Sequence, residues 1–279
     1  MSTFKTFLIT GVSSGLGRAF AQGALDAGHR VIGTVRRKED ADAFAGLAPD
    51  LAHPLVLDVT NYDAIPAAIA NMEARVGPID VLVNNAGYGH EGVMEESSID
   101  DFQRQFAANV FGPVAMTKAV LPGMRERRSG HIVNVTSMGG FITMPGITSY
   151  CGSKFALEGI SEALGKEVAS FGIRVTALAP GQFRTDWAGR SMDRTPRSIP
   201  DYDAVMDPIR AARQTKSGAQ PGDPSKAAQA LLAIVASDAP PVRLFLGEDA
   251  LGLVDQKLIT MKAERDEWNA LSRSTSFTV

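Results

Sequence analysis

The sequence predicts an α/β protein built on a doubly wound parallel sheet of about seven strands, with helices on both faces. Three observations predict this class. Seven short apolar runs recur along the chain, longer amphipathic patterns lie between them, and the runs are apolar almost throughout instead of alternating with polar residues. Strands buried on both faces have this continuous apolar character, and parallel strands need helical crossovers between them.

The expected elements follow in chain order. The strands are Phe4–Thr10, Arg30–Val35, Pro54–Leu57, Asp80–Val83, His131–Thr136, Ile173–Ala179 and Arg243–Leu246. The helices are Leu16–Ala27, Tyr62–Val76, Ser98–Arg128 and Tyr150–Phe171. Each of these segments is long enough and amphipathic enough for helical periodicity. Ser98, with Asp101 three residues later, predicts a capping box at the start of the third helix.

Length and composition predict one dinucleotide-binding catalytic domain over residues 1–279. The chain has 279 residues, of which 44% are hydrophobic and 21% charged, close to the average for globular proteins. Residues 183–224 contain five prolines and no clear period. We expect this segment to be a substrate-covering insertion, with a plain surface excursion as the alternative. A C-terminal helical extension is expected over about 251–279.

Charge, cysteine content and hydropathy exclude several classes of protein. The net charge is −3 and the charged residues are scattered, so no nucleic-acid partner is expected. Cys151 is the only cysteine, so no intrachain disulfide can form. No apolar run approaches the roughly 20 residues that span a bilayer, and the N-terminus lacks the apolar core of a signal peptide. We therefore expect a cytoplasmic protein without a membrane partner.

The stretch TGVSSGLG, Thr10–Gly17, joins the first predicted strand to the first helix and suits a pyrophosphate. Glycines let the backbone approach the phosphates closely, and the helix N-terminus supplies free N–H donors and partial positive charge. The residues expected to contact the cofactor here are Gly11, Ser13, Ser14, Gly15, Leu16 and Gly17.

The end of the second predicted strand bears on the choice of cofactor. A carboxylate there would bind the adenosine ribose and repel a 2′-phosphate, but this chain has Val35 followed by Arg36 and Arg37. Arginine pairs with phosphate in a charge-assisted way, so NADP(H) is expected, with Arg36 at the phosphate. NAD is the second cofactor considered, and simple solvation of both arginines is the alternative for these side chains.

Two more loops are expected at the carboxyl edge of the sheet. Asp58 and Val59 follow the third strand, where Asp58 could accept the adenine amino group or instead cap the next helix. Asn84, Asn85, Ala86 and Gly87 follow the fourth strand. The small residues would let the backbone approach the ribose, and the two amides could tie the loop to its neighbours. A plain turn is the alternative.

Together these residues resemble the short-chain dehydrogenase/reductase family. The matching motifs are TGxxxGxG at Thr10–Gly17, NNAG at Asn84–Gly87, Asn109, Ser137, the YxxxK pair Tyr150 and Lys154, and Pro180-Gly181. The resemblance implies a Rossmann fold, a nicotinamide cofactor held also by Tyr150 and Lys154, and a catalytic group of Asn109, Ser137, Tyr150 and Lys154. It also implies that Pro180, Phe183 and Thr185 lie at the nicotinamide end. A narrower similarity, to members acting on steroids, retinoids or other bulky alcohols and ketones, rests on GYGHEGVMEE and the extended C-terminus.

Tyr150 and Lys154 suit proton transfer because residues four apart share one helix face. A free tyrosine titrates at about 10, and a nearby ammonium would lower that pKa toward neutrality. We therefore expect an acidic Tyr150 beside Lys154, forming a proton relay between an alcohol and its ketone or aldehyde. Ser137 would position the substrate oxygen, and Asn109 would bend its helix and hold a water. Each residue alone also has an ordinary structural alternative.

Other functions fit the residues less well. A serine hydrolase needs a GxSxG elbow and a downstream base, but all four histidines precede Ser137. With scattered histidines and one cysteine, no metal site is expected. Dehydratases and epimerases of the same superfamily usually have TGxxGxxG and a longer C-terminal domain. An NADP(H)-binding sensor or partner protein without significant turnover is the alternative that stays open, because fold alone does not settle function.

Apolar loop residues near the expected nicotinamide site predict an apolar alcohol or ketone as substrate. They are Met94, Met138, Phe141, Met144, Phe183 and Trp187, which could instead belong to the core. His90 is also expected to line this site. The two long helices, Ser98–Arg128 and Tyr150–Phe171, carry more apolar positions than one sheet face needs, and family members of this kind pair such helices. A homodimer or homotetramer is therefore expected.

Overall fold

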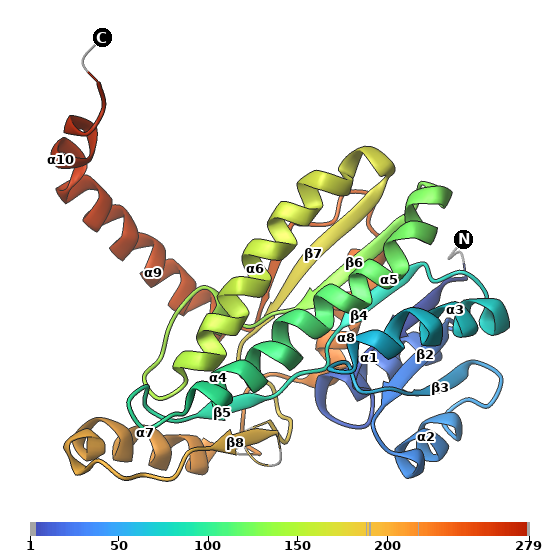
Figure 1. Ribbon diagram of the computed structural model, residues 1–279, viewed down its shortest axis with the longest axis horizontal. Helices are drawn as coiled ribbons and strands as arrows, with labels where there is room; N and C mark the ends of the chain where they lie inside the picture. The colour runs from blue at the N-terminus through green and yellow to red at the C-terminus, as the bar shows by residue number, and fades with distance from the viewer. Residues whose placement is uncertain (1–3, 188, 190, 217, 278–279) are drawn as a thin grey trace.

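Seven parallel strands form the main sheet, in the order β3-β2-β1-β4-β6-β7-β9 (Figure 1). The strands are β1 (Thr6–Ile9), β2 (Arg30–Val35), β3 (Ala52–Val56), β4 (Val81–Asn84), β6 (Gly130–Val135), β7 (Ile173–Pro180) and β9 (Arg243–Leu246). This is a computed structural model, and it describes residues 4–187, 189, 191–216 and 218–277. The predicted Rossmann-like α/β fold is confirmed.

Alternate residues of the strands pack into two separate cores on the two faces of the sheet. In β1, Phe7 and Ile9 belong to one core and Leu8 belongs to the other. The first core is covered by α1 (Gly15–Asp26), α2 (Lys38–Ala45) and α8 (Pro224–Ala236). The second is covered by α3 (Ile65–Val76), α5 (Gly112–Arg127) and α6 (Thr148–Val168). These layers explain why the strands read as continuous apolar runs.

The strand order reverses between β1 and β4, which lie side by side at the centre of the sheet. From β1 the chain winds outward to β2 and β3, then returns to β4 and continues to the other edge. In open α/β sheets, ligands bind outside the carboxyl ends of the strands at such a switch point. The glycine loop after β1 and the NNAG loop after β4 both lie at this point.

The predicted helix Ser98–Arg128 is two α-helices joined by a π-helical segment. These are α4 (Ile99–Phe106), the π segment (Ala107–Phe111) and α5. The capping box is present: Ser98 Oγ accepts a hydrogen bond from Asp101 N at 3.1 Å, and Asp101 Oδ2 accepts one from Ser98 N at 2.8 Å. The π segment contains Asn109, and such wide turns often occur at functional sites.

The insertion expected over 183–224 contains regular secondary structure. It includes β8 (Met192–Arg194) and α7 (Asp203–Lys216), and β8 pairs in parallel with β5 (Gly89–Glu91) in a second, two-stranded sheet. The short sheet lies beyond the carboxyl edge of the main sheet, where it links the insertion to the loop after β4 (Figure 1).

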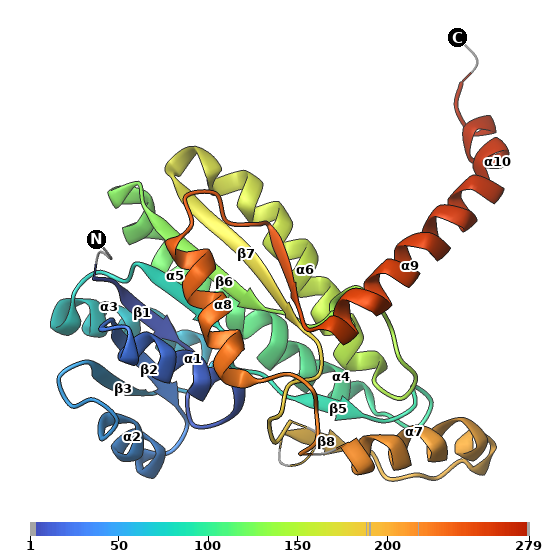
Figure 2. The same ribbon diagram turned by 180° about the vertical axis from the view of Figure 1, so that it is seen from behind.

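The C-terminal extension consists of α9 (Glu248–Glu267) and α10 (Asn269–Ser274). Both helices project away from the layered body, as the two opposite views show (Figures 1 and 2). Within the described part of the chain, no helix is both long enough and apolar enough to cross a membrane.

Candidate active site

The glycine loop between β1 and α1 depends on the absence of side chains. Gly11 and Gly15 have φ angles of +73° and +59°, a region that favours glycine. A Cβ on Gly17 would lie 2.2 Å from the Gly11 carbonyl oxygen and 2.3 Å from Asn85 Nδ2. In the described chain, the helix-capping residue Ser14 makes no side-chain capping bond and no acidic residue occupies the first turn of α1. This helix N-terminus therefore suits an anion.

The NNAG loop is tied directly to the start of the glycine loop. Asn85 Nδ2 donates to the Thr10 carbonyl at 2.9 Å, and the backbone N–H groups of Asn85 and Ala86 both donate to Thr10 Oγ1 at 2.9 Å. Asn84 Nδ2 donates to Asn134 Oδ1 on β6 at 2.8 Å. The two amides hold this loop against its neighbours, as the sequence predicted, and leave its small residues at the switch point.

Asp58 and Val59 form the loop after β3. Asp58 Oδ1 accepts hydrogen bonds from Thr60 N at 2.9 Å and Thr60 Oγ1 at 2.7 Å. The carboxylate thus stabilises its own turn. This arrangement favours a structural role for Asp58 over recognition of adenine by its side chain. Val59 packs on α5, where a Cβ on Gly112 would lie 3.1 Å from the Val59 Cβ.

The two arginines after β2 differ in their environment. Arg37 is held by its neighbour Asp40, to which its Nε and one terminal nitrogen both donate at 2.9 Å. Arg36 is exposed and, among the described residues, forms no side-chain hydrogen bond or ion pair. Of the two guanidinium groups, that of Arg36 has no bonded partner among the described residues.

Tyr150 and Lys154 share the buried face of α6, and Ser137 lies beside them at the end of β6. Only 7% of each of the two α6 residues is exposed. A Cβ on Gly139 would lie 3.3 Å from the Tyr150 ring and 3.4 Å from Ser137 Oγ, so both groups border one small space. Lys154 Nζ donates to the Val135 carbonyl at 2.8 Å and lies 5.8 Å from the centre of the Tyr150 ring.

The protonation of this pair differs from the expectation of an acidic phenol. Burial raises the pKa of Tyr150 to about 12, although a hydrogen bond with Ser137 opposes the effect. Burial also lowers the pKa of Lys154 to about 8, with Glu158 opposing. The loss of water around the phenolate is the largest effect and outweighs the hydrogen bond with Ser137. In the protein by itself, Tyr150 therefore keeps its proton at neutral pH.

Asn109 connects the π segment to the helix that carries Tyr150. Its Nδ2 donates to the Tyr88 carbonyl at 3.0 Å and to Ser153 Oγ at 3.2 Å, and its Oδ1 accepts from Tyr88 N at 3.2 Å. Ser153 Oγ in turn donates to the Tyr150 carbonyl at 2.7 Å. Asn109 thus positions the loop that follows Gly87 against α6.

The segment after β7 crosses back to the glycine loop. Pro180 ends β7, and Phe183 forms a bridge with Gly222. A Cβ on Gly15 would lie 3.8 Å from the Thr185 Cβ, so Thr185 lies next to the glycine loop. Two residues further, Trp187 packs on Tyr150 with ring centroids 5.2 Å apart.

The apolar residues proposed as a substrate lining separate into different environments. Met138 is buried, and Phe141 and Met144 pack against the same cluster near the root of α9. Met144 and Trp187 also pack around Tyr150. Met94 is 62% exposed and joins neither cluster. Met94 is therefore set apart from the other candidates.

His90 does not line the site as expected. It is buried in β5, with Nδ1 3.1 Å from Ser149 Oγ and Nε2 2.9 Å from Thr195 Oγ1. Ser149 precedes Tyr150, and Thr195 belongs to the insertion. The buried imidazole therefore links α6, which carries Tyr150, to the insertion.

Glu91, which the sequence did not single out, anchors the insertion. Its buried carboxylate accepts hydrogen bonds from Arg213 at 2.6 Å and Arg210 at 3.1 Å, and Arg194 Nε lies 3.8 Å away. Glu96 Oε1 adds hydrogen bonds from the backbone N–H groups of Ser198 and Ile199. The sequence contains several glutamates after NNAG and several arginines in the insertion. It does not indicate which glutamate pairs with which arginine.

The family-model comparison identifies the family. Residues 5–195 match the model described as short chain dehydrogenase. The chain belongs to the short-chain dehydrogenase/reductase family. It is therefore an oxidoreductase of the alcohol-converting type that uses a nicotinamide cofactor, and the matched region contains every catalytic residue that the resemblance implied.

Three proteins illustrate the relatives of this short-chain dehydrogenase. "Oxidoreductase BOA17" of Botryotinia fuckeliana (strain B05.10) is 38% identical over 98% of this chain and 99% of its own. "3-Ketodihydrosphingosine reductase" of Bacteroides thetaiotaomicron is 37% identical over 87% of this chain and 88% of its own. The crystal structure of a short-chain dehydrogenase from Streptomyces avermitilis, 42% identical, aligns with a TM-score of 0.92 over 99% of this chain and 100% of its own. This last alignment extends into the C-terminal helices.

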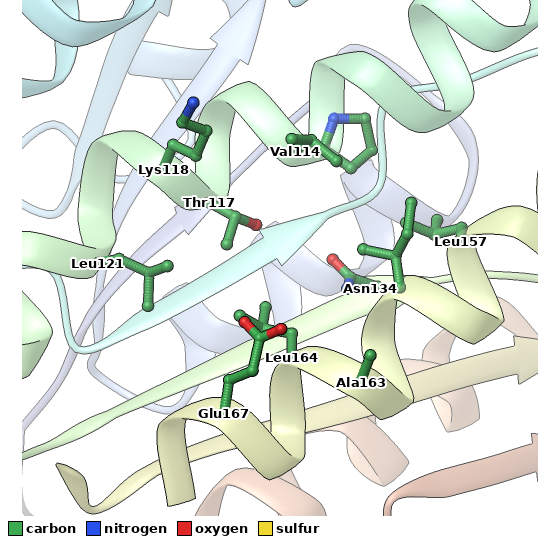
Figure 3. A pocket seen from close by; sticks show the side chains of 11 residues that line it. Val114, Thr117, Lys118, Leu121, Asn134, Leu157, Ala163, Leu164 and Glu167 are labelled. Atoms are coloured by element: carbon green, nitrogen blue, oxygen red, sulfur yellow. The ribbon is translucent and has the colours of Figure 1, made fainter.

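A separate hollow lies outside the candidate site. It has a volume of about 320 Å³ and lies between α5 and α6, where Val114, Leu121, Ile160 and Leu164 form much of its wall (Figure 3). In the part of the chain that the structure describes, no group of three or more His, Cys, Asp and Glu side chains is arranged to hold a metal ion.

Proposed function

We propose that this short-chain dehydrogenase interconverts an apolar alcohol and its ketone or aldehyde with NADP(H), using Ser137, Tyr150 and Lys154 for proton transfer. The observation that supports this most directly is the placement of the three side chains. Ser137 Oγ and the Tyr150 ring border the same space next to Gly139, and Lys154 lies one turn further along the buried face of α6. Binding alone would not need a phenol, a hydroxyl and an amine together.

The pKa of Tyr150 favours proton donation during ketone reduction. A phenol with a pKa of about 12 is protonated at neutral pH and can give its proton to the oxygen of a ketone as that oxygen becomes an alkoxide. Ser137 would hold this oxygen beside the phenol. Lys154, with a pKa of about 8, is charged in most molecules at pH 7 and would stabilise the phenolate left behind. When bound, the nicotinamide supplies or accepts the hydride.

The residues at the switch point fit a dinucleotide. Gly17 packs so closely against Gly11 and Asn85 that no side chain would fit there. The N-terminus of α1 has no side-chain cap. We propose that Gly11, Ser13, Ser14, Gly15, Leu16 and Gly17 hold the pyrophosphate. Asp58, Val59, Asn85, Ala86 and Gly87 would lie along the adenosine, and Pro180, Phe183 and Thr185, with Tyr150 and Lys154, along the nicotinamide half. Asn109 would act by positioning.

NADP(H) is proposed over NAD(H) because of the contrast between two adjacent arginines. Arg37 already holds the carboxylate of Asp40, whereas the guanidinium of Arg36 is exposed at the end of β2. A phosphate on the adenosine ribose would give Arg36 a charge-assisted partner. Val35 offers no carboxylate to bind the ribose hydroxyls of NAD.

The substrate is proposed to be an apolar ketone or alcohol of some length. Trp187 and Met144 pack around Tyr150, and Met138 and Phe141 extend this apolar surface from Ser137 toward α9. The name of the Bacteroides thetaiotaomicron relative, a 3-ketodihydrosphingosine reductase, supports a ketone on a long apolar chain.

A homodimer or homotetramer is proposed from the outer face of α5 and α6. The apolar hollow of Figure 3 lies between these two helices. Phe111, which directly precedes α5, and Phe155 on α6 are 54% and 42% exposed, and exposed large apolar side chains are typical of an interface. A second copy of the same two helices would cover them around a two-fold axis.

Measuring turnover and binding together tests the proposed activity. NADPH oxidation would be followed with a series of 3-ketones of increasing chain length, beside NADPH binding by fluorescence. We expect turnover that improves with chain length and a loss of at least about a thousandfold in Tyr150→Phe, since general acid catalysis contributes on this scale. Tight NADPH binding without turnover on any ketone or alcohol would instead favour a sensor of the same fold.

A further inference from the structure

The C-terminal arm, α9 and α10, is a helix that leaves the protein body with little to pack against. At about 1.5 Å per residue, the 20 residues of α9 extend roughly 30 Å. Ala250 and Val254, at its root, are the only buried residues described in α9, and they pack near Met138 and Ile142. Most helices in proteins owe their stability to tertiary packing instead of intrinsic propensity. Beyond its root, the arm has no such packing among its described residues.

One stripe of the arm has the spacing of a coiled-coil seam. Its members alternate steps of three and four residues: Leu251, Val254, Leu258, Met261, Arg265 and Trp268. A repeat of this kind brings its members to one side of a helix and is the a/d pattern of paired helices. Four of these side chains are half exposed or nearly so, at 50% for Leu251 and Leu258, 46% for Met261 and 58% for Trp268.

We propose that the arm pairs with the same arm of a second copy of this chain, with the two helices antiparallel. A two-fold axis near Ile259 and Thr260 would bring Leu251 opposite the partner's Trp268 and Leu258 opposite the partner's Met261. The same register brings the partner's Arg265 near Val254, which is already buried at the root of the arm. Each exposed apolar member of the stripe thereby gains a counterpart, which is the self-complementary condition of a two-fold interface.

The charges beside the stripe favour this orientation. In the antiparallel register Asp255 lies close to the partner's Lys262, and Lys257 lies close to the partner's Glu264. The two-fold axis repeats both pairs, giving four attractive contacts. A parallel, in-register pair would instead bring Lys257 toward the partner's Lys262, because g and e positions meet in parallel coiled coils. Flanking charges of this kind select the partner and its direction.

The net charge of the arm argues for a protein partner instead of an anionic membrane. Residues 248–277 carry six carboxylates and four cationic side chains, a net charge of −2. Helices that lie on anionic membranes carry an excess of lysine and arginine on the polar face. The arm has the opposite balance.

Pairing would bring the tip of one arm to the root of the other. The partner's Trp268 would pack on Leu251, one turn before Val254, whose side chain contacts the cluster that follows Ser137. The arm interface is also separate from the outer face of α5 and α6. Two different two-fold interfaces on one chain would build a tetramer with three two-fold axes.

A charge swap tests the pairing without relying on catalysis. Molecular mass would be measured by analytical ultracentrifugation over a range of concentrations at low salt, with the full-length protein. Lys257→Glu and Glu264→Lys should each weaken the association about tenfold or more, because two attractive pairs become repulsive in each variant. The double variant K257E/E264K should restore it. Glu267→Lys, which makes the same charge change on the outer side of the helix, is the matched control and should have no effect.

Cross-linking tests the direction. Leu251→Cys and Trp268→Cys proteins should form a disulfide-linked dimer under oxidation only when mixed, since each new thiol is distant from its own copy in an antiparallel pair. The proposal is overturned if the single charge variants keep the wild-type association, if the swap does not restore it, or if Leu251→Cys cross-links to itself. All these measurements are independent of NADPH turnover, so a failure of the proposed activity would leave them unaffected.

Discussion

Trp187 packs on Tyr150, with ring centroids 5.2 Å apart and ring planes inclined by 58°. The insertion therefore supplies one wall of the space next to the candidate proton donor. The indole also lies against Gly89, where a Cβ would be 2.7 Å from the Trp187 ring, so the ring is held from two sides. An apolar substrate chain leaving the carbonyl would meet a fixed aromatic surface.

Trp187→Ala should therefore reduce kcat/KM for long-chain ketones about fivefold or more, since a buried aromatic contact contributes roughly 1 kcal/mol. The effect should appear mainly in KM and should be small for a short ketone that does not reach the indole. Steady-state kinetics on a matched pair of long and short ketones measures the difference. Met94→Ala, a change at an exposed apolar side chain, is the control, and equal losses on both ketones would remove Trp187 from the pocket.

Arg36→Ala should weaken NADPH binding about ten- to a hundredfold, because a hydrogen bond to a charged group contributes about 1.5–3 kcal/mol. NADH, which has no 2′-phosphate, should bind almost as before. Fluorescence titration with both nucleotides gives the ratio directly. Arg37→Ala is the matched control, since its guanidinium is already held by Asp40. A similar loss for NADPH and NADH in the Arg36 variant would count against the phosphate contact.

The sequence predicted the sheet well because its strands are buried on both faces. β2 and β9 begin and end at the predicted residues, and the other five strands differ by one or two residues at their ends. Residue order along the chain also placed the glycine loop, Ser137 and Tyr150 correctly at the carboxyl edge. A continuous apolar run leaves few other ways to bury its residues.

The helices outside this pattern were harder to predict. α2 has only Ala41 and Phe44 buried, and α7 carries Pro208 in its interior, a residue that usually breaks a helix. α8 was overlooked although Asp223 caps it and Pro224 occupies its first position, a typical helix start. The π turn at Asn109 depends on contacts with Tyr88 and Ser153 that no local pattern encodes.

In the protein alone the pKa of Tyr150 is raised, unlike the acidic phenol expected from the sequence, because burial outweighs the hydrogen bond with Ser137. The spacing of Tyr150 and Lys154 predicts their common face, but not how deeply both are buried or that Lys154 bonds to the Val135 carbonyl. Glu91 shows the same limit: its partners Arg210 and Arg213 are 119 and 122 residues away. Only tertiary structure brings such groups together.

The depressed pKa of Lys154 should make stability depend on pH. Its pKa is about 8 in the folded protein and 10.5 in the ordinary case, so between these values the unfolded chain binds more protons. The free energy of unfolding should therefore rise with pH in this window. From pH 8 to 9.5 this single group should contribute about 1–2 kcal/mol.

Urea unfolding of the wild type and Lys154→Met at pH 8 and pH 9.5 isolates this contribution. The difference in unfolding free energy between the two proteins should change in favour of the wild type as the pH rises. The comparison stops at pH 9.5 because Tyr150, with a raised folded pKa, acts in the opposite direction above pH 10. A pH-independent difference would show that Lys154 has an ordinary pKa.

Glu91→Gln should loosen the insertion, because the variant keeps the size of the side chain but removes the charge that Arg210 and Arg213 share. The carboxylate is 2% exposed, and breaking a buried ion pair leaves the partner charges without compensation. We expect a loss of about 2–3 kcal/mol in unfolding free energy or in the local stability of α7. Hydrogen exchange of α7 amides should accelerate, and KM for long-chain ketones should increase because Trp187 belongs to the same insertion.

Glu95→Gln is the appropriate control for this change. Its carboxylate also bonds to the insertion, accepting from the Tyr202 hydroxyl at 2.7 Å, but at the protein surface. An exposed contact contributes less than about 1 kcal/mol, so the Glu95 variant should exchange nearly as the wild type does. Unchanged α7 exchange in Glu91→Gln, or equal acceleration in both variants, would mean that the buried ion pairs do not hold the insertion in place. Glu91→Gln should accelerate α7 exchange more than Glu95→Gln does, because water screens only the Glu95 contact.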